Sequence, residues 1–285
     1  MPSVAAAEIA RMRESVFFEG PELGRRLSRF WILLVLAAII AAAGVVGDST
    51  ATVIGAMIVA PLMLPIQATM LSVVLADRVN LMRSLALVVA GASTAILIGW
   101  LMGFVVVGDV VAATNSQVAA RVSPRLIDLL AALATGVVGS VALARRDISD
   151  TLPGVAIAIS LVPPLSVVGL TLNAGEYSQA GGAMLLFLTN VAAILLTGTV
   201  VMAIYGVHRL TAPDVPSAIK AVDRRKAIVV IVAMLVLVGV PLTTASMRIA
   251  RETTRESTVR EVAQRWSAET GWQLVRVSLT SGKLT

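Results

Sequence analysis

The sequence predicts an all-α integral membrane protein with about seven transmembrane helices. Hydrophobic residues make up 57% of the chain and charged residues only 14%, whereas a soluble domain carries about 25% charged residues. Apolar stretches of roughly 20 residues, the length that crosses a bilayer as a helix, recur between Phe30 and Met247. Two of these stretches contain prolines near their middles, and this pair is the most informative feature of the sequence.

The predicted spans follow one another with short loops between them. They cover Phe30–Val46, Ala51–Ala76, Ser84–Val107, Leu126–Ala144, Thr151–Leu172, Ala183–Val207 and Ala227–Met247. Before them, residues 1–29 are expected to form a cytoplasmic N-terminal segment with a short polar helix that stops at Gly20-Pro21. The transmembrane domain is therefore expected over residues 30–247 and an extracytoplasmic tail over residues 248–285.

Arginine and lysine residues predict the orientation of the chain. They gather before the first span and in the loops after the second, fourth and sixth spans, while the other loops carry only Arg121 and Arg125. Because positive residues mark cytoplasmic loops, the N-terminus is expected in the cytoplasm and the C-terminal tail outside. The basic residues lie between spans, so the net charge of +6 indicates membrane orientation rather than nucleic-acid binding.

The C-terminal tail changes its pattern along its length. Glu256 and Arg260 stand four residues apart, as in a solvated helix with ion pairs. After Gly271 the apolar residues alternate, which is typical of a strand. One helix and one strand cannot bury a core, so the tail is predicted to begin a small α/β domain that continues past Thr285 or packs on another subunit.

The two proline-containing stretches are predicted to be broken helices, the second and the fifth of the chain. A proline inside a helix removes a backbone hydrogen bond and costs about 3 kcal/mol, and no water repairs this loss in hydrocarbon. The stretches align at Val59-Ala60-Pro61-Leu62 and Val162-Pro163-Pro164-Leu165. Each is second in a group of three spans, so the sequence predicts a 3+3 inverted repeat plus one further helix. Paired interruptions of this kind point to a binding site between repeats.

Four runs of residues match a known family. They are SRFWILLVLAAIIAAAGVVGDST, TVIGAMIVAPLMLPIQA, LPGVAIAISLVPPLSVVGL and FLTNVAAILL. Together they resemble domain-of-unknown-function family 389, whose members are uncharacterised hydrophobic multi-pass proteins of prokaryotic membranes. The resemblance implies an all-helical fold in the prokaryotic cell (inner) membrane, and it implies no particular activity.

The candidate site lies at the paired breaks. Helix ends carry partial charges of about half a unit and can hold an ion or a polar solute without ionised side chains. The candidate binding residues are Pro61, Pro65, Gln67, Ser160, Pro163, Pro164, Ser166 and Asn190, with Thr189 as a weaker candidate. A packing kink between close helices would explain the same prolines, and interhelical hydrogen bonding would explain Gln67 and Asn190.

Carboxylates add one stronger and one weaker candidate. Asp128 lies one turn inside the fourth span, and because a charge is expensive there, we expect it to face the bundle as a proton or cation site. Asp48 stands with Ser49 at the start of the second span. An N-cap of that helix would explain Asp48 without a ligand, so Asp48 and Ser49 are the weaker candidates.

The sequence does not predict an enzyme. The chain contains no cysteine and one histidine, His208, and no metal-binding or Walker motif, so no catalytic residue, metal or cofactor is predicted. The favoured function is a transporter or channel for a small polar solute or ion. The alternative is a non-transporting oligomeric scaffold or sensor whose C-terminal tail binds a partner. The expected partners are the lipid bilayer, a small polar solute or ion, and further copies of the chain.

Overall fold

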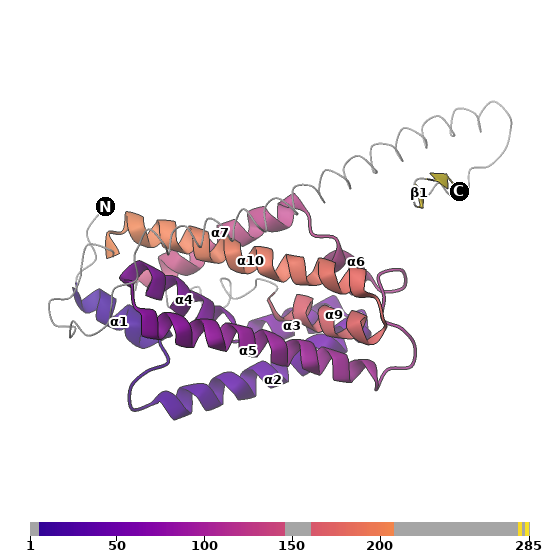
Figure 1. Ribbon diagram of the computed structural model, residues 1–285, viewed down its shortest axis with the longest axis horizontal. Coiled ribbons are helices and arrows are strands. Elements are labelled where there is room, and N and C mark those ends of the chain that lie inside the picture. Colours follow the sequence, from indigo (N-terminus) through magenta and orange to yellow (C-terminus); the bar gives the residue numbers. More distant parts are fainter. Residues whose placement is uncertain (1–5, 146–160, 208–278, 281–282, 285) are drawn as a thin grey trace.

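The computed structural model is a bundle of helices (Figure 1), and it describes residues 6–145, 161–207, 279–280 and 283–284. The helices are α1 (Ala6–Val16), α2 (Leu23–Val46), α3 (Thr50–Val59), α4 (Met63–Leu75), α5 (Arg78–Gly103), α6 (Ser116–Val122), α7 (Leu126–Ala144), α9 (Val162–Asn173) and α10 (Tyr177–Ile204). Two short strands of the tail, β1 (Leu279–Thr280) and β2 (Lys283–Leu284), pair antiparallel.

The bundle has two ends, which we name after the short helix at each (Figure 1). The α1 end holds α1, the turn between α4 and α5, and the last turns of α7 and α10. The α6 end holds α6, the turn between α2 and α3, and the turn between α9 and α10. α10 packs against α7, α9 and α4, and α5 packs against α9, α4 and α2. These two helices therefore hold the bundle together.

Several of the helices are of membrane-spanning length and composition. α2, α5, α7 and α10 are each long and apolar enough to cross a membrane, and α3 and α4 qualify as one bent pair. Large apolar side chains such as Ile32, Val89 and Leu97 are exposed on the outside of the bundle, as expected for helices that face lipid. The predicted all-helical, membrane-type fold is thus confirmed in outline. The seventh predicted span and most of the tail lie outside the described residues, so the seven-helix repeat stays a prediction.

Side-chain caps define where three of the helices begin. Ser49, Asp77 and Asn115 each accept a hydrogen bond from the backbone N–H three residues later, at the starts of α3, α5 and α6. Such caps satisfy amides that have no partner within the helix. At the other end of α4, Ala76 adopts a left-handed conformation with a φ of 57°. This residue lets α4 turn directly into the cap of α5.

The N-terminal helix is part of the bundle. Met12, Val16 and Phe17 are buried, and α1 packs against α4 and α7. The Arg11 guanidinium donates a hydrogen bond of 2.9 Å to the carbonyl of Leu143, near the end of α7. The segment that the sequence predicts as a polar lead-in therefore closes one end of the fold.

Candidate functional site

The chain bends by 47° between α3 and α4. α3 ends with Ala60 as its C-cap, and Pro61 lies in the bend itself. Pro65 stands in the first turn of α4, where backbone amides have no partner within the helix and a proline removes no hydrogen bond. The bend therefore comes from the interruption at residues 60–62, and Pro65 helps to start the second half of the pair.

The second pair of prolines begins a half-length helix. Pro163 and Pro164 stand in the first turn of α9, whose 12 residues extend over about 18 Å, well short of the roughly 30 Å of a hydrocarbon core. Every residue from Val162 to Thr171 is buried. Pro163 and Pro164 have no N–H, so this helix start offers fewer amide donors to a bound anion than an ordinary one.

Three segments near the breaks share one apolar core. Met63 and Ile66 at the start of α4, Leu165 at the start of α9, and Phe187 and Val191 in the middle of α10 belong to the same buried cluster. α10 is also a direct neighbour of both α4 and α9. The structure thus brings the starts of the two half-helices to the same long helix.

The predicted polar residues near the breaks have different surroundings. Ser166 is fully buried and its hydroxyl has no hydrogen-bond partner. Gln67 donates a hydrogen bond of 3.0 Å from Nε2 to the carbonyl of Gly139 in α7. Thr189 donates to the carbonyl of Leu185 one turn earlier in α10, and Asn190 beside it is buried. Ser160 lies outside the described residues.

Asp128 caps its own helix. Its Oδ2 accepts a hydrogen bond of 2.7 Å from the Arg125 N–H, and the Arg125 side chain lies 3.9 Å away as an ion-pair partner. Its side chain is 28% exposed. This geometry accounts for a carboxylate at the start of α7 without a bound cation, and the role of Asp128 as a proton or cation site stays a prediction.

Asp48 links two turns at the α6 end. The N-cap interpretation of Asp48 is wrong, because Ser49 is the residue that caps α3. Asp48 has a φ of 48°, and its Oδ1 accepts hydrogen bonds from the Ser116 hydroxyl at 2.7 Å and the Gln117 N–H at 3.0 Å. The Ser116 hydroxyl, together with the backbone amides, holds the pKa of Asp48 below its usual value. Asp48 therefore anchors the start of α6 to the end of α2.

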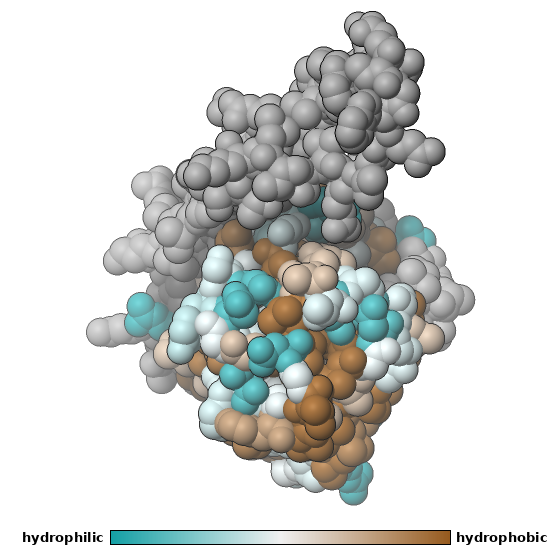
Figure 2. Space-filling model, turned by 90° about the vertical axis from the view of Figure 1, so that its right-hand side faces the viewer, coloured by the Kyte–Doolittle hydropathy of each residue, from teal (hydrophilic) through white to brown (hydrophobic). Residues whose placement is uncertain are grey.

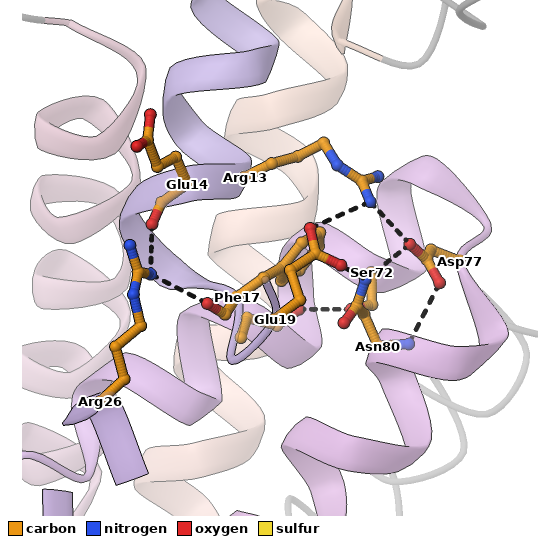
Figure 3. Close-up of polar contacts among 9 residues, drawn as sticks. Arg13, Glu14, Phe17, Glu19, Arg26, Ser72, Asp77 and Asn80 are labelled. Atoms are coloured by element: carbon orange, nitrogen blue, oxygen red, sulfur yellow. Dashed lines mark hydrogen bonds and ion pairs between the residues drawn. The ribbon is translucent and has the colours of Figure 1, made fainter. Parts of the chain in front are cut away.

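A polar cluster at the α1 end was not predicted from the sequence (Figure 3). Arg13 pairs with both Glu19 and Asp77 at 3.3 Å, and the Asn80 amide donates to both carboxylates at 2.9 Å. Burial raises the pKa of Asp77, but the hydrogen bonds from Asn80 and the charge of Arg13 outweigh it, so the pKa lies below the ordinary value of 3.8. The cluster joins the N-terminal segment to the turn between α4 and α5.

A chain of buried hydrogen bonds leads from this cluster to the start of α4. The Ser84 hydroxyl donates to the carbonyl of Asn80 at 2.6 Å and lies 3.1 Å from the Thr69 hydroxyl. Thr69 in turn lies 2.8 Å from the carbonyl of Pro65. The bonds from Ser84 to Asn80 and from Thr69 to Pro65 are hydroxyl bonds to the backbone one turn earlier, so the sequence carries no signal for the contact between Thr69 and Ser84 that joins α4 to α5.

No metal centre is found in the part of the chain that the structure describes, since no group of three His, Cys, Asp or Glu side chains there is placed to hold an ion.

Comparison with known proteins finds relatives without an assigned function. The chain is 32% identical over 196 residues to an uncharacterized protein of Methanocaldococcus jannaschii, MJ0678; the match covers 69% of this chain and 60% of that relative. No solved structure matches the chain. Residues 57–196 match the family described as a domain of unknown function, DUF389. The similarity to this family therefore extends from the last turn of α3 into α10 and includes all four candidate prolines, Pro61, Pro65, Pro163 and Pro164.

Proposed function

We propose that the protein is a transporter or channel for a small polar solute or ion, with its binding site where α9 begins beside α4 and α10. One observation carries the proposal: the Ser166 hydroxyl is fully buried, in the second turn of a half-length helix, without a hydrogen-bond partner. A buried hydroxyl without a partner costs about 1–3 kcal/mol. A polar ligand or water that enters beside α9 would satisfy it.

The order of the helices supports an inverted repeat around this site. α2, the α3–α4 pair and α5 are followed by α7, α9 and α10. α4 runs toward the α1 end before it joins α5, whereas α9 runs toward the α6 end before it joins α10 (Figure 1). The second halves of the two proline-containing spans thus run in opposite directions, as an inverted repeat requires.

The distribution of arginine supports a cytoplasmic α1 end in a prokaryotic inner membrane. Arg11, Arg13, Arg25, Arg26, Arg29, Arg78, Arg83 and Arg145 all lie on segments at the α1 end, and Arg121 and Arg125 on those at the α6 end. Such an excess marks the cytoplasmic side of a membrane protein. We infer no enzymatic activity from this arrangement.

The second candidate function, an oligomeric scaffold or sensor, is favoured by how tightly α5 and α9 pack. A Cβ on Gly103 would overlap the Asn173 side chain, and a Cβ on Gly169 would overlap the backbone of Ile96 and Trp100. Small residues that let helices approach this closely are typical of static packing in membranes. In this interpretation the start of α9 is dry and the unpartnered hydroxyl of Ser166 is a packing defect.

Access of water to Ser166 separates the two functions. The chain has no cysteine, so Ser166→Cys introduces a single thiol, and its labelling by a small membrane-impermeant reagent is measured from each side of native membranes. Transport predicts labelling that changes with solute or pH, because an aqueous path reaches α9. Absence of labelling from both sides would contradict the transporter function.

Three further single-cysteine variants make the result interpretable. Ser15→Cys and Ser178→Cys, at exposed positions of α1 and α10, report the two sides and should react from opposite sides. Ser140→Cys is the matched buried control, because Ser140 is 2% exposed and donates to the carbonyl of Gly136 one turn earlier. It should stay unlabelled while Ser166→Cys reacts.

A further inference from the structure

A buried arginine lies at the α6 end of the bundle. Arg121, in the last turn of α6, is only 9% exposed. α6 is seated tightly, since a Cβ on Gly182 of α10 would overlap the carbonyl of Val122, and α6 also packs against α9. Figure 2 looks onto this end and shows hydrophilic side chains grouped there beside apolar ones. The packing of α6 thus withdraws the guanidinium from water at a polar face of the molecule.

The guanidinium uses few of its donors. Nη1 donates to the backbone carbonyl of Gln117 at 2.6 Å and to the Gln117 Oε1 at 3.1 Å. Nε is buried without a hydrogen-bond partner. Both acceptors of Arg121 are neutral groups of one residue, although a guanidinium offers five N–H donors in a planar fork.

The positive charge of Arg121 lacks an acidic partner within residues 6–145 and 161–207, where no carboxylate forms an ion pair with it. Burial lowers the pKa of Arg121, yet an arginine stays protonated at neutral pH. Asp48 is joined to Gln117 through the backbone N–H of that residue, so its charge acts on Arg121 only at a distance. A buried charge without a counter-charge is strongly unfavourable.

Other polar groups are hydrogen-bonded to Gln117, the residue that Arg121 contacts. The Gln117 Nε2 donates to the Thr50 hydroxyl at 2.8 Å and lies 3.5 Å from the Ser116 hydroxyl, which itself donates to Asp48. Hydroxyl and amide groups of this kind bind oxyanions alongside a guanidinium. The one acceptor that occupies Nη1 from a side chain, Gln117 Oε1, is neutral and can be displaced by a stronger, charged acceptor.

We propose that Arg121 anchors a binding site for a small oxyanion, of the carboxylate type, at the α6 end of the bundle. The anion replaces Gln117 Oε1 on the guanidinium and makes the two parallel hydrogen bonds that the fork of Nε and the terminal nitrogens favours. The displaced Gln117 side chain turns its amide N–H groups toward the anion. This site is separate from the start of α9 and does not depend on the proposed transport function.

The test is the thermal unfolding of the purified full-length protein in detergent, followed by tryptophan fluorescence. Sodium acetate is compared with sodium chloride at the same ionic strength, so that screening is equal. Acetate should raise the unfolding midpoint of the wild type above its value in chloride by about 2–4 °C. Arg121→Gln should lose this difference. Arg125→Gln, the matched control at a side chain that is 66% exposed, should keep it.

Two results would overturn the proposal. One is an equal midpoint in acetate and chloride for the wild type, and the other is an acetate effect in Arg121→Gln as large as in the wild type. If Arg121→Gln does not fold, Arg121→Lys is tested in its place, because lysine keeps the positive charge but lacks the planar fork of the guanidinium. The unfolding midpoint of Arg121→Lys should then be the same in acetate and in chloride. If Arg121→Gln changes the oligomeric state instead, the counter-charge comes from a second copy and the proposal is wrong.

Discussion

The backbones of Gly99 in α5 and Ser166 in α9 are in direct contact: a Cβ added to Gly99 would lie 2.5 Å from the carbonyl oxygen of Ser166. Gly99→Ala should therefore force α5 and α9 apart and destabilise the protein by about 1–3 kcal/mol. The measurement is the unfolding midpoint in detergent. Gly55→Ala is the control, because a Cβ on Gly55 in α3 meets nothing within 4 Å. Equal midpoints for the two variants would contradict this packing.

Two adjacent glycines of α10 provide a stricter comparison. A Cβ on Gly182 would overlap the carbonyl of Val122 in α6, whereas a Cβ on Gly181 has open space around it. Gly181→Ala should be neutral or stabilise the protein by up to about 1 kcal/mol, since alanine favours a helix. Gly182→Ala should destabilise it, because α6 must move. Unfolding midpoints measured side by side check the order, and a reversed order would show that α6 does not pack as described.

The Asp77 carboxylate makes the stability of the folded protein depend on pH in the acidic range. Its pKa in the folded protein lies below 3.8, so its ionised form stabilises the fold fully above the unfolded-state pKa of about 3.9. That contribution is lost as the pH falls from this value through the lower folded pKa. We expect the wild type to lose more stability than Asp77→Asn between about pH 5 and pH 3. Unfolding midpoints across that range measure the difference.

Asp109→Asn serves as the control for this pH series. Asp109 lies at an exposed position outside the helices, so its substitution should leave the acid dependence of the wild type unchanged. If Asp77→Asn and the wild type lose stability in parallel, the hydrogen bonds from Asn80 and the charge of Arg13 do not favour the ionised form of Asp77, and the pH prediction fails.

The cap at Asp128 predicts a difference between two substitutions. Asparagine keeps a side-chain oxygen that can accept from the Arg125 N–H, so Asp128→Asn should leave the unfolding midpoint nearly unchanged. Asp128→Ala removes the acceptor and should destabilise the protein by about 0.5–2 kcal/mol. A large loss in both variants would mean that the charge itself matters, as expected for the predicted cation site.

The sequence predicted the features that depend on neighbouring residues. Hydropathy located the long apolar helices. Pro61 lies in the bend between α3 and α4, and the pair of broken spans stays a prediction. The residue that caps α3 was misassigned by one position, because Asp48 and Ser49 are both good caps and only the left-handed φ of Asp48 decides between them.

The features that depend on distant residues could not be predicted. Gln67 binds the carbonyl of Gly139, and a backbone carbonyl has no signature in a sequence. In the sequence, Arg121 falls between two predicted spans, where a basic residue indicates orientation. Its burial follows from the contact of α6 with Gly182, which is encoded some 60 residues later.

The position of α1 has a consequence for how the protein is made. Arg11 is synthesised before α2, yet its partner carbonyl belongs to Leu143 near the end of α7, and its neighbour Met12 is fully buried in the bundle. The contact of α1 with α7 therefore forms only after α2 through α7 have been made, whereas α1 can pack against α4 earlier. The closure of the α1 end by the bond between Arg11 and Leu143 is thus a late step in the folding of these helices.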